Sequence, residues 1–233
     1  FAWCPIEQDF STTVNFETQT SCALPRAGDL VAQMYVRMVL PNLPFTTPSA
    51  AGATANWNSN STYCNGAGYA VLNDVELSIG GYPFDKQSGM YMFLWDQLSH
   101  KPQAQEHVTC LQGAWSELAA TAADTAWSAT LGTGGTHLGA AAGQPLFVPL
   151  SFWFNRFYAQ ALPMIALQYH EVKLTVDFNS LANIVQAQFV GPAGAADAPA
   201  QTTGAQAFAA NLQINYVFLD TVERRLFAAT PHE

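Results

Sequence analysis

The stretch YAVLNDVELSIGGYPFD, residues 69–85, decides the fold class of this chain. Between Val71 and Ile79 every second residue lies on one face, and all but Asn73 on that face are apolar, which is the period of a β-strand. The pair Gly80-Gly81 follows, and such a pair is typical of a tight turn between two strands. Residues 82–85 have the character of a second, short strand. The stretch therefore predicts local β-structure closed by a glycine turn.

Strand patterns of the same kind recur along the chain, at 12–20, 30–40, 145–154, 172–178 and 211–220. Segments 46–68, 99–143 and 191–206 lack such a pattern and are rich in small residues, so we expect long loops there. There is no internal repeat and no change of composition that marks a domain boundary. About eight antiparallel strands with long connections predict an all-β jelly roll, in which two sheets pack face to face.

One or two short helices interrupt this β pattern. The hydroxyl of Ser88 can cap a helix whose next residues place Met90, Phe93, Leu94 and Leu98 on one stripe. With Gln97 they make up a stripe of five positions, four of which are apolar. A helical turn is also expected at 155–161, before Pro163.

Composition excludes several classes of function. The chain of 233 residues has a net charge of −9 and no basic patch, so direct nucleic-acid binding is not expected. No apolar run reaches the length of about 20 residues that spans a membrane, so membrane insertion is not expected either. Charged residues make up 11% of the chain, against about 25% in typical soluble domains. This low charge suggests that neighbouring molecules cover much of the surface.

No motif predicts an active site, a cofactor or a metal. His170 and Glu171 are adjacent and would point to opposite faces of a strand, so they cannot easily share one ligand. The alternation of apolar and polar residues shifts by one position beside them, as it would at a β-bulge or where a strand changes its packing partner. The other histidines lack metal-binding spacing, and residues 132–139 fit no nucleotide-binding loop. These remaining histidines are His100, His107, His137 and His232.

Other residue types leave alternatives open. Asn60 begins an Asn-Ser-Thr glycosylation sequon in a predicted loop. Arg224 and Arg225 are either a solvated pair or hold an acidic group on a neighbouring subunit. The four cysteines allow three disulfide pairings, and reduced thiols are the default expectation. They are Cys4, Cys22, Cys64 and Cys110.

Several motifs, taken in order, resemble one known family. They are RAGDL (26–30), LNDVELSIGGYPFDKQSG (72–89), FVPLSFWFNR (147–156), IALQYHEV (165–172) and YVFLDTVERRLFA (216–228). Together they resemble the major capsid protein of nucleocytoplasmic large DNA viruses, the group of the iridoviruses and phycodnaviruses. The resemblance spans nearly the whole chain.

The resemblance implies a structural protein of the virion, assembled in the host cytoplasm, rather than an enzyme. Members of this family fold as two jelly rolls in tandem, and three copies form a pseudo-hexameric capsomer of an icosahedral shell. Residues 1–220 would be the first roll and 221–233 the start of a connection to a second; a single-roll relative is the other possibility. Partners would be further copies, neighbouring capsomers and minor capsid proteins.

The long loops are the natural candidates for subunit contacts, and the longest of them contains Trp115 and Trp127. Arg224 and Arg225 are further candidates for such contacts. The alternative function is a carbohydrate-binding jelly roll on a virion or cell surface, in which Trp57, Trp115 and Trp127 would stack on sugars. A hydrolase on the same fold would need a cluster of titratable groups that the sequence does not contain.

Overall fold

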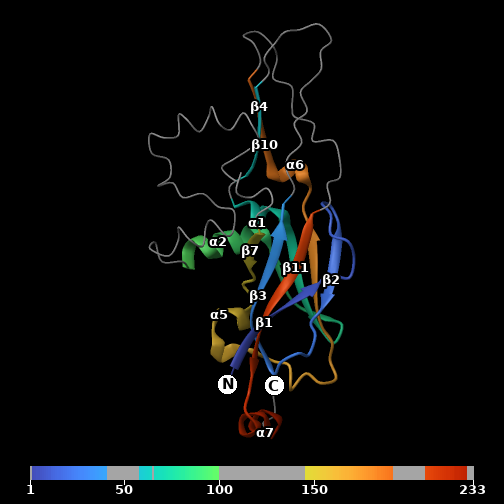
Figure 1. Ribbon diagram of the computed structural model, residues 1–233, viewed down its shortest axis with the longest axis vertical. Helices are drawn as coiled ribbons and strands as arrows, with labels where there is room; N and C mark the ends of the chain where they lie inside the picture. The colour runs from blue at the N-terminus through green and yellow to red at the C-terminus, as the bar shows by residue number, and fades with distance from the viewer. Residues whose placement is uncertain (1, 41–57, 65, 100–144, 191–207, 230–233) are drawn as a thin grey trace.

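The computed structural model describes residues 2–40, 58–64, 66–99, 145–190 and 208–229. Two packed antiparallel sheets form the body of the molecule, with a two-stranded ladder at one end and a helix at the other (Figure 1). The ladder pairs β4 (Asn58–Tyr63) with β10 (Val185–Val190). No helix in the described ranges is both long enough and apolar enough to cross a membrane.

The first sheet has the strand order β1-β11-β3-β7, and β8 also pairs with β3. Its members are β1 (Ala2–Asp9), β11 (Ala209–Phe218), β3 (Leu30–Val39), β7 (Pro145–Pro149) and β8 (Leu162–Pro163). The second sheet has the order β2-β9-β5-β6. Its members are β2 (Gln19–Ala23), β9 (Val172–Phe178), β5 (Leu72–Ile79) and β6 (Tyr82–Ser88).

This topology is that of a jelly roll. Four pairs of strands lie antiparallel: β1 with β11, β2 with β9, β3 with β7, and β5 with β6. The first strand thus pairs with the last, the second with the next to last, and so inward to the hairpin of β5 and β6, as in a long hairpin that has been rolled up. The predicted eight-stranded sandwich is confirmed by these strands, four in each sheet; β8 and the β4–β10 ladder are additions to it.

The core lies between the two sheets and follows the strand period of two. Alternate side chains of β3, β5, β9 and β11 point inward and are buried, while their neighbours are more exposed. The inward set is Met34, Val36, Met38, Val75, Leu77, Val172, Leu174, Val176, Leu212, Ile214 and Tyr216. Burial of these side chains is the main stabilising contribution to the sandwich.

The hairpin predicted from Gly80-Gly81 is present. Ile79 pairs with Tyr82 across the two glycines. Both glycines have positive φ, 60° and 84°, which a type I′ turn requires and which costs glycine little.

The expected strand at 12–20 was wrong over most of its length. Glu17 has φ 59°, and the hydroxyl of Thr18 donates to the carbonyl oxygen of Asn15 at 2.7 Å. This turn breaks the strand, so that β2 begins at Gln19. Val14 and Phe16 are buried as expected, but from a loop.

The shift in the apolar alternation beside His170 is not caused by a β-bulge. Residues 164–169 form turns, in which Ala166 N–H donates to Pro163 O at 3.1 Å and His170 N–H donates to Leu167 O at 3.1 Å. The strand β9 begins at Val172, so the upstream residues belong to a different local structure.

Short helices lie at the ends and along one side of the sandwich (Figure 1). They are α1 (Ala67–Val71), α2 (Gly89–Ser99), α5 (Trp153–Arg156), the 3₁₀ turn η3 (Tyr158–Gln160), α6 (Leu181–Ile184) and α7 (Thr221–Ala229). Part of the loop expected at 46–68 is therefore regular structure, because β4 and α1 lie in it. Asn60 lies in β4, where its backbone pairs with Gln188, and not in a loop.

Candidate assembly surfaces

The helix α2 begins where the sequence predicted, and most of its apolar stripe faces outward. Ser88 Oγ accepts a hydrogen bond from Tyr91 N–H at 3.3 Å, so the expected cap is formed. Met92 is the large apolar side chain that α2 buries, whereas Met90 and Leu98 are 68% and 84% exposed. Phe93 of the same stripe packs against the core, so the stripe is divided between the interior and the surface.

The outward stripe is part of a larger surface that we call the aromatic patch. It gathers exposed side chains from α2, from β6 and from α5. Its residues are Phe84, Met90, Tyr91, Leu94, Trp95, Leu98, Trp153 and Arg156. Because β6 ends one sheet and α5 follows β7, which ends the other, the patch lies along one edge of the described sandwich.

Contacts within the aromatic patch hold its rings in place. Tyr91 and Trp95 stack with ring centroids 6.4 Å apart. The guanidinium carbon of Arg156 lies 4.2 Å from the centre of the Trp95 ring, and its Nη2 donates to Tyr91 Oη at 3.0 Å. Phe84 and Trp153 join β6 to α5 at a centroid distance of 6.3 Å. A cation over an indole face at an exposed site contributes about 0.5–1 kcal/mol.

Beneath the patch, α2 is fixed to the sandwich. Phe93 meets the buried ring of Tyr69 edge-on at 5.9 Å. A Cβ atom on Gly89 would lie 2.0 Å from Leu72 O and 2.2 Å from Tyr69 O, so the helix backbone rests directly on the backbone of α1 and β5. The helix that presents most of the aromatic patch is therefore packed closely against the sandwich.

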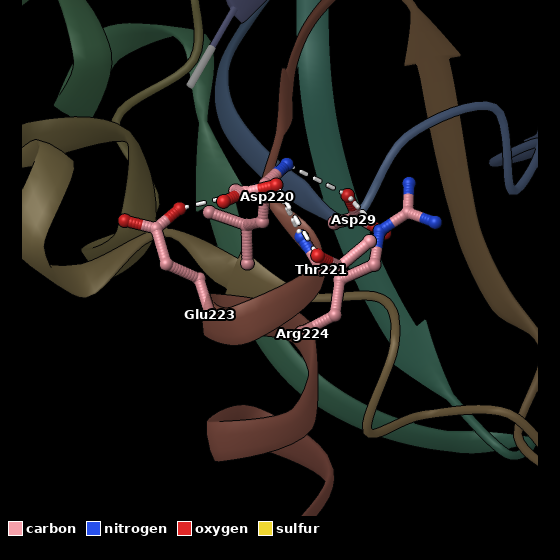
Figure 2. Close-up of polar contacts among 6 residues, drawn as sticks. Asp29, Asp220, Thr221, Glu223 and Arg224 are labelled. Carbon is pink, nitrogen blue, oxygen red and sulfur yellow. Dashed lines mark hydrogen bonds and ion pairs between the residues drawn. The ribbon is translucent and has the colours of Figure 1, made fainter.

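A second structured surface, which we call the C-terminal joint, fixes the start of α7. It consists of Asp29, Leu219, Asp220, Thr221, Glu223 and Arg224. Figure 2 shows Asp29, Asp220, Thr221, Glu223 and Arg224 near the point where the sandwich meets the helix. The joint lies at the opposite end of the molecule from the β4–β10 ladder (Figure 1).

The carboxylate of Asp29 is the centre of the joint. Its Oδ2 accepts hydrogen bonds from Leu219 N–H at 2.8 Å and from Arg224 Nε at 3.0 Å (Figure 2). Its own backbone N–H donates to Val217 O at 3.1 Å, and its carbonyl accepts from Ile165 N–H at 3.2 Å. Asp29 is 8% exposed, so these partners replace the water that a carboxylate needs.

The first turn of α7 is closed by its own side chains. Asp220 Oδ1 accepts from Thr221 N–H at 2.7 Å, and Glu223 Oε2 accepts from Asp220 N–H at 3.2 Å. This reciprocal arrangement resembles a capping box and satisfies amides that a helix start leaves free. The direction in which the chain leaves the sandwich is therefore set by polar contacts at the joint.

The candidate residues of the sequence analysis are partly placed. Arg224 is bound by Asp29 of its own chain, and Arg225 is exposed on α7. Trp57, Trp115 and Trp127 lie outside the described residues, as do Cys110, His100, His107, His137 and His232. Cys4, Cys22 and Cys64 form no disulfide with one another.

His170 and Glu171 are exposed, and the structure uses their backbone. The carbonyl of Glu171 accepts from Gly80 N–H at 2.8 Å, and that of His170 accepts from Arg26 Nη2 at 3.1 Å. In the described part of the chain, no three His, Cys, Asp or Glu side chains gather in a way that could hold a metal ion.

Sequence reasoning missed Asp29 and the outward direction of the stripe. Asp29 lies in the motif RAGDL, and its partners Leu219 and Arg224 lie about 190 positions later in the chain, so no local pattern joins them. One signal for the patch was available in the sequence: between Gly89 and Ser99 the sole charged residue is Asp96, whereas a solvated helix face normally carries charges.

Comparison with known proteins gives consistent similarities. A family model described as "Major capsid protein N-terminus" matches residues 1–220. The major capsid protein of Pyramimonas orientalis virus is 31% identical over 233 residues, covering 100% of this chain and 48% of the relative. Capsid protein 1 of Acanthamoeba polyphaga mimivirus is also 31% identical, over 100% of this chain and 36% of the relative.

A solved structure, described as the PBCV-1 virus capsid in a quasi-atomic model, superposes with a TM-score of 0.69 at 28% identity. The alignment covers 99% of this chain and 45% of that one. This chain thus spans about half, or less, of the length of the relatives that it matches.

Proposed function

The chain belongs to the major capsid protein family and matches the N-terminal region of its members. From this premise we propose that it is the first jelly roll of an icosahedral capsid subunit. The observation that carries the proposal is the family match over residues 1–220, together with capsid relatives that align along the whole chain. The place of the protein is then the capsid shell of the virion. The role is structural, with no reaction to perform.

Residues 1–220 are, in this proposal, one roll, and residues 221–233 lead toward a second roll. The C-terminal joint supports this division, because α7 begins at Thr221 and is fixed to the end of the sandwich by Asp29. A rigid connection of this kind would hold two rolls at a defined angle.

The subunit assembles with copies of itself as a homotrimer, whose six rolls give a pseudo-hexameric outline. Neighbouring capsomers and minor capsid proteins are its further partners. The acidic balance, with a net charge of −9, supports a shell protein that does not grip the genome directly.

The test is the mass of the complete gene product in solution. Multi-angle light scattering and native mass spectrometry at micromolar concentration should give three times the chain mass, and negative-stain images should show six-sided particles. A protein that stays monomeric under these conditions would contradict the proposal.

A further inference from the structure

We propose that the aromatic patch is the surface through which this roll packs against a second copy of the subunit. The inference rests on the proposed function and deepens it by naming the contact. It starts from the position of the patch along one edge of the sandwich, where β6 and β7 end the two sheets. An edge of this kind, if left open, invites pairing with other chains, and proteins normally cover or charge it.

The size of the patch fits a subunit interface. Its seven apolar side chains are between 37% and 84% exposed. With about 150–250 Å² for each large ring and somewhat less for Leu and Met, the patch presents roughly 700 Å² of apolar surface. The largest apolar patch on a typical monomer is about 300–600 Å², and a standard interface buries about 800 Å² on each partner.

The chemistry of the patch points the same way. Every exposed residue of α2 is uncharged, and the one acidic residue of that helix, Asp96, is buried. Tryptophan, tyrosine and arginine are the residues most often found at binding hot spots, and here Trp95, Tyr91 and Arg156 lie in mutual contact. Because these contacts already order the side chains, little further conformational entropy is lost when a partner docks.

A hollow adjoins the patch and can accept a side chain of the partner. It has a volume of about 320 Å³ and is lined by Met90 and Phe93 of α2, by Tyr69 and by polar groups of Asn73 and Asn179. An apolar rim with a few polar groups is the usual form of an anchor pocket. The occupant is a second copy, because the exposed apolar area approaches the roughly 800 Å² that each partner buries in a standard interface between subunits. A threefold ring uses a heterologous contact, so the patch meets a different surface of the next copy.

The first experiment changes the patch without touching the core. The complete gene product carrying Leu94→Glu and Leu98→Glu is compared with the unchanged protein and with Val222→Glu, a matched change on α7. Val222 is 71% exposed, and α7 lies at one end of the molecule, away from α2 at the side of the sandwich (Figure 1). Light scattering over a concentration series should show trimers for the unchanged and control proteins. The double variant should dissociate at concentrations at least about 100-fold higher. Because the dissociation constant of a trimer varies as the square of the midpoint concentration, this shift corresponds to about 5.5 kcal/mol per trimer.

A trimer of the double variant with the dissociation midpoint of the unchanged protein would overturn the inference while leaving the proposed function intact. Failure of the unchanged protein to form trimers would instead refute the proposed function. The double variant therefore tests the inference, and the unchanged protein tests the proposed function.

A second experiment identifies the occupant and does not depend on how the double variant folds. A photo-crosslinking amino acid replaces Leu98 in the otherwise unchanged trimer, which is irradiated and run on a denaturing gel. A covalent species of twice the chain mass, whose peptides all come from this protein, supports the inference. Crosslinks confined to one chain, crosslinks to a different protein, or no crosslink would overturn it.

Discussion

Asp29 shows how one buried side chain can hold two distant parts of a chain together. Its carboxylate oxygen binds an amide at the end of β11 and the guanidinium of Arg224 in α7. Loss of the two hydrogen bonds should have different effects on stability. Arg224 is half exposed, so water can replace the carboxylate as its hydrogen-bond partner, whereas the carboxylate of Asp29 is nearly buried. From the sequence, Arg224 was a candidate for a contact with a neighbouring subunit; in the structure its Nε donates to the carboxylate of Asp29 in the same chain.

We predict that Asp29→Ala lowers the free energy of unfolding by about 1–3 kcal/mol, because it leaves a backbone amide without its acceptor. Arg224→Ala should cost less than about 1 kcal/mol, since it removes one half-exposed partner of an ion pair. Urea denaturation of both variants and of the unchanged chain measures the difference. Equal losses for the two variants would show that the ion pair, and not the amide bond, is the important contact.

At the scale of one element, α2 shows the difference between a pattern and its use. Ser88 caps the helix as its sequence predicted, because capping depends on residues within one turn. The direction of the stripe depends on where the rest of the chain packs. Gly89 lets the helix approach α1 and β5 backbone to backbone, and this contact orients Met92 inward and the stripe outward.

Gly89→Ala should therefore destabilise the chain strongly. The added Cβ atom would meet two backbone oxygens, and overpacking against backbone costs about 3 kcal/mol or more. The control is Gly81→Ala, where φ is 84° but no atom lies within 4 Å of the new Cβ, so about 1 kcal/mol of backbone strain is the whole cost. Thermal and urea unfolding of both variants compare them, and a Gly89 variant no less stable than the Gly81 variant would contradict the close approach.

At the scale of the whole molecule, the sandwich keeps several titratable groups neutral. Burial raises the pKa of the Cys22 thiol to about 11, and the charge of Asp9 adds to this rise. Burial also raises the pKa of the Tyr216 and Tyr69 hydroxyls; the Cys22 thiol adds to the first effect and the charge of Asp96 to the second. These groups belong to the packed interior, so their ionisation is coupled to the stability of the roll.

The free energy of unfolding should fall as the pH rises from about 9 to about 11. In that window the Cys22 thiol is ionised in the unfolded chain but still protonated in the folded one, so unfolding releases a proton. The contribution is fully present below pH 9 and is lost as the pH passes the raised value. Urea titrations at pH 7, 9 and 10.5 should show this decline, and Cys22→Val should make it shallower. Parallel pH profiles for the two proteins would exclude Cys22 as a source.

The sequence by itself determined the local structure that depends on neighbouring residues. Strand alternation in β3, β5 and β9, the turn at Gly80-Gly81 and the cap of α2 were all predicted, because period and turn geometry act over a few residues. The strand expected at 12–20 was lost because a turn, with Glu17 in a left-handed conformation, has a weaker sequence signal than alternation. The family resemblance, carried by whole motifs, was confirmed by the match over residues 1–220.

The tertiary structure alone decided which strands meet and which faces stay open. β1 pairs with β11 across almost the whole chain, so that Asn211 Nδ2 donates to Glu7 Oε2 although 204 positions separate them. The contact of Asp29 with Arg224 and the outward stripe of α2 depend on the same rolling of the chain. Periodicity states that a side chain is apolar, but burial also needs a partner surface, and that surface is assembled only when distant segments pack.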